Sequence, residues 1–306
     1  MVMAELQDQT NINIQEKANL IWEIATHLVG LYKPHEYGKV ILPMTVLKRF
    51  DDALAETKDD VIAMRKKLDE QKIEGEARDG ILCRISKYDF YNTSNFNFAK
   101  LIADPDNIKD NFETYIKGYS DNVKDILASF KFDNEIETMA DGGVLFVVLQ
   151  EFNSKKAQMS PDKITSADMG YIFEELIRKF SESYDEQAGA HFTSRDIIYL
   201  MTELLIFPQQ DEIMESDCAK TAYDMAMGTS QMLGCLTERL NQINPSMQMT
   251  CFGQEFNPET YAIAKADMLI KGGNASGMLY GDTLSDDKFE GYEFDYIISN
   301  PPFGID

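Results

Sequence analysis

From Lys220 onward the sequence alternates between short β-type runs and longer helical runs, and this alternation limits the fold more than any other feature of the chain. The helical runs carry apolar residues at helical spacing. Strands that are separated by helices lie parallel and are joined by right-handed crossovers. The pattern therefore predicts an α/β fold with a doubly wound parallel sheet. The expected strands are 221–225, 249–255, 277–282 and 294–299, and the expected helices between the first three are 230–243 and 257–273.

The residues before this region read as mainly helical. Apolar residues recur at helical spacing in the stretch "ANLIWEIATHLV", and similar patterns follow up to about residue 152. The stretch "SPDKITSADM" (160–169) has the composition of a junction, and an amphipathic helix is expected directly after it, at 169–182. We therefore expect a helical domain in residues 1–160 and the α/β domain in residues 161–306.

Composition limits where the chain acts and what it binds. The net charge is −23, so the chain lacks the positive surface that binding to the phosphates of nucleic acid requires. No run is as apolar and as long as a membrane span, and the N-terminus has no signal-peptide pattern, so we expect a cytoplasmic protein. The four cysteines are scattered, which predicts buried thiols and no disulfide frame or metal site.

Candidate functional residues stand where the expected strands end. Ligands of open α/β sheets bind at the carboxyl ends of the strands. Polar and glycine residues follow each strand in turn: Asp224, Gly228 and Thr229 after the first, Glu255 after the second, Asp282 after the third, and Asn300, Pro301, Pro302 and Phe303 after the fourth.

The first two of these positions together suit a nucleoside-type ligand. Gly228 lies between a strand and a helix, where a ligand can approach the backbone and the helix N-terminus. Glu255 can accept both hydrogen bonds from a ribose diol. A glycine that serves a tight turn and a glutamate that flanks a helix would look the same, so the pair alone leaves both interpretations open.

The tetrapeptide 300–303 is more specific. Each proline fixes φ, lacks an N–H and holds its predecessor in extended geometry. The resulting stiff turn presents the Asn300 side-chain oxygen and the Pro301 carbonyl as fixed acceptors, while Phe303 supplies a flat apolar ring. Two acceptors and a ring suit a flipped-out adenine, whose amino group donates two hydrogen bonds and whose face stacks. The alternative is a turn that only ends a strand.

These residues resemble a known family. The run Asn300-Pro301-Pro302-Phe303 is similar to the catalytic motif of amino-group DNA methyltransferases. Longer blocks resemble the modification (methyltransferase, HsdM-type) subunit of type I restriction–modification systems, and the resemblance covers nearly the whole chain. They are "YKPHEYGKVILPMTVLKRFD", "MGYIFEELIRKFSE", "AGAHFTSRDI", "FGQEFNPETYAIAKADMLIKGG" and "GDTLSDDKFEGYEFDYIISNPPFGID".

The resemblance implies a role for each candidate. Asn300 and Pro301 would hold the adenine amino group, Pro302 would stiffen the same turn, and Phe303 would stack on the base. The cofactor implied is S-adenosylmethionine. Its ribose would be bound by Glu255 and its adenine by Asp282; its methionine part would be lined by Asp224, Gly228 and Thr229; and Phe192 and Thr193 would close over it.

The chain departs from the family pattern at several points. In the first loop, "DMAMGTSQM" (224–232), Met225 and Met227 replace proline and cysteine, and Ser230 and Gln231 replace two glycines. Side chains are therefore expected where the ligand meets the backbone, which predicts weakened cofactor binding. Ser194 replaces a proline at a helix start. The family's sheet also continues beyond the fourth strand, so the resemblance implies a chain truncated after the tetrapeptide.

The resemblance implies a DNA adenine methyltransferase subunit that transfers methyl from S-adenosylmethionine to the exocyclic amino group of adenine. It would reach DNA through a specificity subunit and work with a restriction subunit, in a hetero-oligomer with two modification subunits. Three alternatives stay open. The chain could be a non-catalytic assembly fragment with a degenerate cofactor loop. It could methylate glutamine in proteins, whose amide is chemically similar. A nicotinamide dinucleotide fold fits least well, because the first loop lacks the required glycine spacing.

Overall fold

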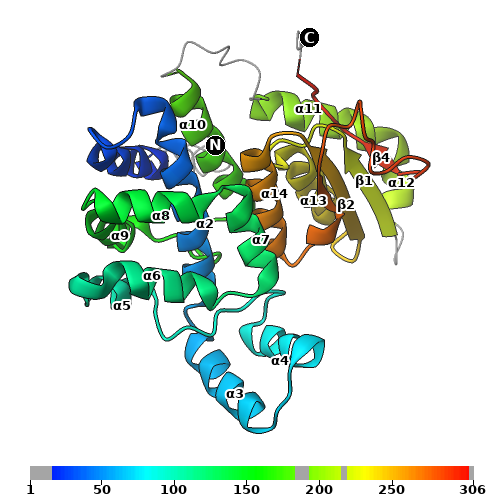
Figure 1. Cartoon of the computed structure of the whole chain (residues 1–306). Coiled ribbons are helices and arrows are strands. Elements are labelled where there is room, and N and C mark those ends of the chain that lie inside the picture. Colours follow the sequence, from blue (N-terminus) through cyan, green and yellow to red (C-terminus); the bar gives the residue numbers. More distant parts are fainter. Residues whose placement is uncertain (1–15, 183–192, 215–218, 303–306) are drawn as a thin grey trace. The chain divides into compact units, whose positions relative to one another are not determined.

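The computed structural model describes residues 16–182, 193–214 and 219–302, and these residues form two compact units. The units divide between Thr165 and Ser166. The first is entirely helical apart from short bridges, and the second contains all the strands that the structure describes (Figure 1). None of the described helices is both long and apolar enough to cross a bilayer.

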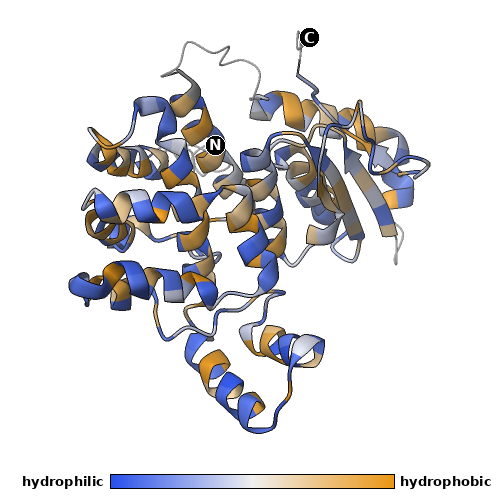
Figure 2. Cartoon of the chain, in the orientation of Figure 1, coloured by the Kyte–Doolittle hydropathy of each residue, from blue (hydrophilic) through white to orange (hydrophobic). Residues whose placement is uncertain are grey.

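The first unit is held together by an aromatic core. Phe50, Phe112 and Tyr115 are fully buried, and the Phe112 and Tyr115 rings stack with their centroids 6.1 Å apart. Figure 2 shows both hydrophobic and hydrophilic residues along most of its helices, as expected for amphipathic helices that cover a core. After a helical stretch at 16–25, the helices are α2 (Gly38–Leu54), α3 (Lys58–Glu70), α4 (Gly75–Ser86), α5 (Phe98–Ile102), α6 (Ile108–Lys117), α7 (Asp121–Ser129), α8 (Phe132–Asp141) and α9 (Leu145–Phe152), with short 3-10 turns between them.

The second unit is an α/β fold, as the alternation of strands and helices predicts. Within the described residues, all strand pairings of this unit are parallel, and the four strands lie in the order β3-β2-β1-β4. The strands are β1 (Ala219–Asp224), β2 (Gln248–Glu255), β3 (Met278–Tyr280) and β4 (Tyr296–Ile297), and the helices are α10 (Ser166–Glu182), α11 (Arg195–Ile206), α12 (Gln210–Ile213), α13 (Gln231–Ile243) and α14 (Pro258–Lys271).

Register in the sheet sets the positions of the strand ends. Asp224 pairs with Gly253, so β2 runs two residues further than β1 and ends at Glu255. On the other side of β1, Tyr223 pairs with Ile297. β1 therefore lies between the strand that carries Glu255 and the strand that leads to Asn300.

Helix α14 shows how local sequence sets an element boundary. Asn257 is its N-cap, and the side-chain oxygen of Asn257 accepts hydrogen bonds from the backbone N–H groups of Glu259 and Thr260. Pro258 follows at the first helical position, where its missing N–H costs nothing. Gly272 ends the helix in the left-handed conformation, with φ of 68°. The helix therefore begins at Pro258, three residues after Glu255.

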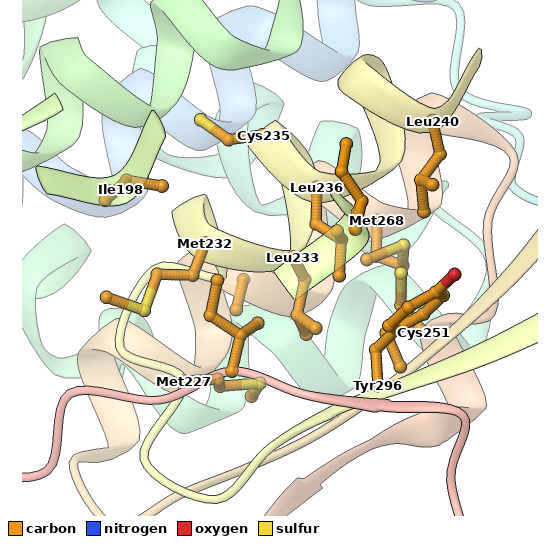
Figure 3. Close-up of a cluster of buried hydrophobic side chains, with 14 of the residues drawn as sticks. Ile198, Met227, Met232, Leu233, Cys235, Leu236, Leu240, Cys251, Met268 and Tyr296 are labelled. Atoms are coloured by element: carbon orange, nitrogen blue, oxygen red, sulfur yellow. The ribbon is translucent and has the colours of Figure 1, made fainter. Parts of the chain in front are cut away.

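The core of the second unit is rich in sulfur. Figure 3 shows Met227, Met232, Cys235 and Met268 among the aliphatic side chains, together with Cys251 from β2. Met227 comes from the loop after β1, is buried, and packs against the backbone of Gly253 so closely that a Cβ built there would lie 2.3 Å from its sulfur. This side chain fastens the loop to the sheet beneath it.

Candidate functional site

The loop between β1 and α13 turns through two residues in the left-handed conformation. Gly228 has φ of 53° and Ser230 has φ of 68°, both in the left-handed region. A Cβ added to Gly228 would meet nothing within 4 Å, so that side of the loop is open. Ser230 stands where the family has a glycine and adopts the left-handed conformation that glycine adopts without cost. The backbone strain of this turn therefore lies at Ser230.

Two side chains of this loop are buried. Met227 packs in the hydrophobic core, and Gln231 is buried against α10. Neither side chain therefore fills the open side of Gly228, and the weakened cofactor binding expected from Ser230 and Gln231 stays a prediction. Ser230 is 2% exposed, and its Oγ makes no hydrogen bond within the described part of the chain.

Helix α10 contributes a buried acid that holds the loop. Thr229 Oγ1 donates to Oε1 of Glu174 at 3.4 Å. Since a carboxylate only accepts, the nitrogen of the Gln231 amide faces Glu174, donating to Oε2 at 2.8 Å, and its oxygen accepts from the Tyr171 hydroxyl at 2.7 Å. Sequence reasoning missed Glu174 and Tyr171, because nothing in the helix pattern shows which loop they contact.

Glu255 connects the ends of the first two strands. Its Oε2 accepts a hydrogen bond of 2.8 Å from the N–H of Gly228, and its Oε1 accepts one of 2.7 Å from the N–H of Asn257. A carboxylate has about four acceptor positions, so each oxygen retains capacity for a ligand hydroxyl. Together with the open side of Gly228 and the buried Ser230 hydroxyl, this set fits a ligand that carries a diol.

Asp282 follows β3 but contacts its own turn. Its two carboxylate oxygens accept from the N–H of Leu284 at 3.1 Å and from Ser285 Oγ at 2.8 Å. The N–H of Gly281 donates to the carbonyl of Glu255 at 3.0 Å, which ties this turn to the end of β2. The turn therefore borders the site, although no hydrogen bond joins the Asp282 side chain to the other candidates that the structure describes.

Asp224 is the most buried of the candidates that the structure describes, with 1% exposure. Its Oδ1 accepts from Ser299 Oγ at 2.6 Å and from the N–H of Ala226 at 3.0 Å. Burial raises the pKa of Asp224 from 3.8 to about 7, and the nearby charge of Glu255 acts in the same direction, while the two hydrogen bonds oppose the rise.

The turn after β4 reaches back to the segment before α11. Asn300 is exposed, and its Nδ2 donates to Thr193 Oγ1 at 2.9 Å. This contact leaves the amide oxygen of Asn300 as an acceptor. Pro301 and Pro302 are also exposed. Phe192 and Phe303 lie outside the described residues.

Two exposed apolar side chains at the same edge of the sheet were also missed. Phe256 directly follows Glu255 and is 70% exposed, and Leu284 follows Asp282 and is 96% exposed. An apolar residue directly after a strand-ending acid is a signal that sequence reasoning could have used. Among the described residues, no group of three His, Cys, Asp or Glu side chains is placed to hold a metal ion.

Two family models match almost the whole chain between them. Residues 17–152 match the HsdM N-terminal domain, and residues 165–306 match the N-6 DNA methylase family.

Individual relatives are methylase subunits of type I restriction enzymes. The type I restriction enzyme MjaIX methylase subunit of Methanocaldococcus jannaschii is 22% identical over 94% of this chain and 51% of that protein. The HindI methylase subunit of Haemophilus influenzae is 26% identical over 44% of this chain and 29% of that protein. The chain thus spans about half the length, or less, of these curated relatives. The crystal structure of a type I restriction–modification methyltransferase subunit from Streptococcus thermophilus superimposes with a TM-score of 0.67 at 21% identity, over 95% of this chain and 64% of that one, which shows a shared fold.

Proposed function

The chain belongs to the family of methyltransferase subunits of type I restriction–modification systems, and we propose that it transfers a methyl group from S-adenosylmethionine to the exocyclic amino group of adenine in DNA. The observation that supports this most is the layout around β1. Glu255 and Gly228 are hydrogen-bonded on one side of this strand, and the Asn300 turn follows β4 on the other side. A cofactor and a base bound at these two places would meet over the end of β1.

In the cofactor site, Glu255 accepts hydrogen bonds from the ribose hydroxyls through its unused acceptor positions. Asp282 is assigned to the adenine ring, and Gly228 and Thr229, in the loop that follows Asp224, line the methionine part. Phe192 and Thr193 close over it. The bound cofactor supplies a methyl group on a positively charged sulfur, which is electrophilic. The fit rests on the open side of Gly228 and on the buried Ser230 hydroxyl.

The catalytic residues that bind the base are Asn300, Pro301, Pro302 and Phe303. The Asn300 oxygen and the Pro301 carbonyl accept the two hydrogens of the adenine amino group, which directs the nitrogen lone pair outward. The prolines hold these acceptors still, and Phe303 stacks on the base. The chain orients the reactants and needs no general base, because the amino nitrogen attacks before it loses its proton.

We propose that DNA is brought to this site by other subunits. A net charge of −23 disfavours contact with phosphates by this chain alone. A specificity subunit would read the sequence, a restriction subunit would cleave unmodified DNA, and two modification subunits would share one specificity subunit. The helical unit is the proposed docking part and the α/β unit the proposed catalytic part. We place the assembly in the cytoplasm, in agreement with the free thiols of Cys83, Cys235 and Cys251.

Calorimetric titration with S-adenosylmethionine tests this proposal most directly. The wild-type protein should bind S-adenosylmethionine. Glu255→Ala should weaken binding at least tenfold, because the ribose contact and the Gly228 hydrogen bond are lost together. With its specificity subunit, the wild type should methylate adenine in DNA, and Asn300→Ala should abolish transfer while leaving cofactor binding intact. Absence of cofactor binding by the wild type would instead support the alternative of a non-catalytic assembly role.

A further inference from the structure

The loop after β1 and the turn that carries Asn300 share one buried side chain. Asp224 ends β1, and Ser299 immediately precedes Asn300. Ser299 Oγ donates to Asp224 Oδ1 at 2.6 Å, directly beyond the last backbone contact between the two strands, in which the N–H of Ile298 donates to the carbonyl of Tyr223 at 3.1 Å. A side-chain bond thus extends the β1–β4 pairing by one further step.

The same oxygen of Asp224 also holds the loop. It accepts from the N–H of Ala226 at 3.0 Å, two residues into the loop. Ala226 is followed by Met227, whose N–H donates to the carbonyl of Gln254 at 3.1 Å and whose side chain is buried in the core. The Ala226 end of this link is therefore fixed to the sheet, so a displacement of Ser299 cannot be absorbed by a movement of the loop.

The burial of Asp224 favours a supporting role over direct ligand contact. It is 1% exposed, and Oδ1 is engaged by two protein donors. An ionised carboxylate in such a place is costly unless it is hydrogen-bonded, and its bonds from Ser299 and Ala226 are charge-assisted and therefore strong. Ser299 has no comparable alternative partner in the described structure, so Asp224 determines where its side chain lies.

We propose that Asp224 is a positioning residue for the base-binding turn: through Ser299 it fixes the backbone from which Asn300 presents its acceptor. This inference rests on the proposed adenine methyltransfer and assigns Asp224 a role different from lining the cofactor. Misplacement of the Asn300 acceptor by a fraction of an ångström would slow transfer, because the reacting nitrogen must be aligned with the methyl group.

If Asp224 positions the turn, the rate of methyl transfer should depend on pH in the range where Asp224 ionises. Ionised Asp224 accepts strongly from Ser299 and Ala226, and protonated Asp224 accepts weakly. The charged group that acts on it from the neighbouring strand is Glu255, which raises the pKa of Asp224 further. Transfer should therefore rise with pH between about 6 and 8, as Asp224 with its pKa of about 7 ionises.

The test uses the full-length subunit assembled with its specificity subunit. Ser299→Ala should slow single-turnover methyl transfer about tenfold and leave the dissociation constant of S-adenosylhomocysteine within about twofold, because it removes only the link. Ser299→Thr, which keeps the hydroxyl, should restore transfer. Asp224→Asn should flatten the pH profile between 6 and 8. Ser246→Ala is the matched control: its Oγ donates to Asn244 Oδ1 at 2.7 Å, at the opposite end of β2.

Each outcome of this test supports or contradicts the positioning role of Asp224. If Ser299→Ala transfers methyl at the wild-type rate, or weakens S-adenosylhomocysteine as much as it slows transfer, Asp224 does not position the turn. Ser299→Ala keeps the proposal testable if Asp224→Asn fails to fold. A wild type that binds the cofactor and methylates adenine upholds the proposed function whatever Ser299→Ala does; a wild type that does neither rejects both.

Discussion

Thr193 and Asn300, more than a hundred residues apart, meet through a hydrogen bond of 2.9 Å from Nδ2 of Asn300 to Oγ1 of Thr193. An asparagine amide can present either its nitrogen or its oxygen, and adenine's amino group requires the oxygen. With the nitrogen engaged by Thr193, the oxygen remains for the base. In the proposed function, Thr193 would thus support base binding as well as closure over the cofactor.

A first prediction follows for Thr193. Thr193→Val keeps the shape of the side chain but cannot accept from Asn300, so single-turnover methyl transfer should fall about tenfold. Thr193→Ser should retain the wild-type rate within about threefold. Equal rates for the valine variant and the wild type would show that the amide is held in place by other contacts.

The second prediction separates the two unusual loop residues. Ser230 is in the left-handed conformation, which costs a non-glycine residue about 1 kcal/mol, so Ser230→Gly should stabilise the protein by roughly that amount. Gln231→Gly should instead destabilise it by about 1–3 kcal/mol, because Glu174 and Tyr171 lose a buried partner. Chemical denaturation measures both changes. Ser230→Ala, which keeps the Cβ and the strain, is the control.

A third prediction concerns stability and pH. Asp224 has a pKa of about 7 in the folded chain and an ordinary value of 3.8, so between these values the folded state binds the proton that the unfolded state releases. Its contribution to stability therefore decreases as pH rises from about 4 to about 7 and is constant above that, with a total of roughly 4 kcal/mol.

Hydrogen exchange of β1 and β4 amides, measured from pH 4 to 8, reports this effect locally. Asp224→Asn should remove the dependence of stability on pH in this range while keeping an acceptor for Ser299. A slope of the same size in wild type and variant would assign it to other groups.

The fourth prediction concerns DNA. The chain on its own should bind a DNA duplex more weakly than about 1 µM at physiological salt, because its net charge is −23. Fluorescence anisotropy measures this, and addition of the specificity subunit should strengthen binding by at least tenfold. Submicromolar affinity without any partner would contradict the proposed division of labour.

The fifth prediction concerns self-association of residues 1–306. One face of α11 is apolar and exposed, with Ile197 at 53%, Leu200 at 59% and Leu204 at 67%. Ile297 in the end strand β4 is also 52% exposed. Surfaces of this kind promote association. Leu200→Lys with Leu204→Glu should reduce association measured by sedimentation, whereas a charge change on exposed Lys117 should not; a monodisperse wild type would refute the expectation.

Periodicity predicted the elements of the α/β unit well, and local side chains explain where it failed. Residues 294–299 were expected to form a strand, but β4 covers only Tyr296–Ile297. Asp295 explains the late start of this strand, since its carboxylate accepts from the N–H of Thr221 at 2.8 Å, so a side chain takes up the donor that a longer ladder would use. β3 ends at Tyr280 because Gly281 turns the chain with φ of 151°.

The candidate site could be located from sequence but its contacts could not. Strand ends determine that Asp224, Glu255 and Asn300 share an edge, because parallel strands bring their carboxyl ends together. Which side chain meets which depends on packing between distant segments. Glu174 lies more than fifty residues before Gln231, and only the placement of α10 against α13 joins them.

The sulfur-rich core under the loop gives the protein a chemical vulnerability. Oxidation of Met227 to the sulfoxide would put a polar oxygen against Gly253, where the thioether has no free space. The loop would be pushed away from the sheet and would carry Gly228 out of reach of Glu255. A single oxygen atom added within the hydrophobic core would therefore damage the proposed cofactor site, and a sulfoxide reductase would be needed to restore it.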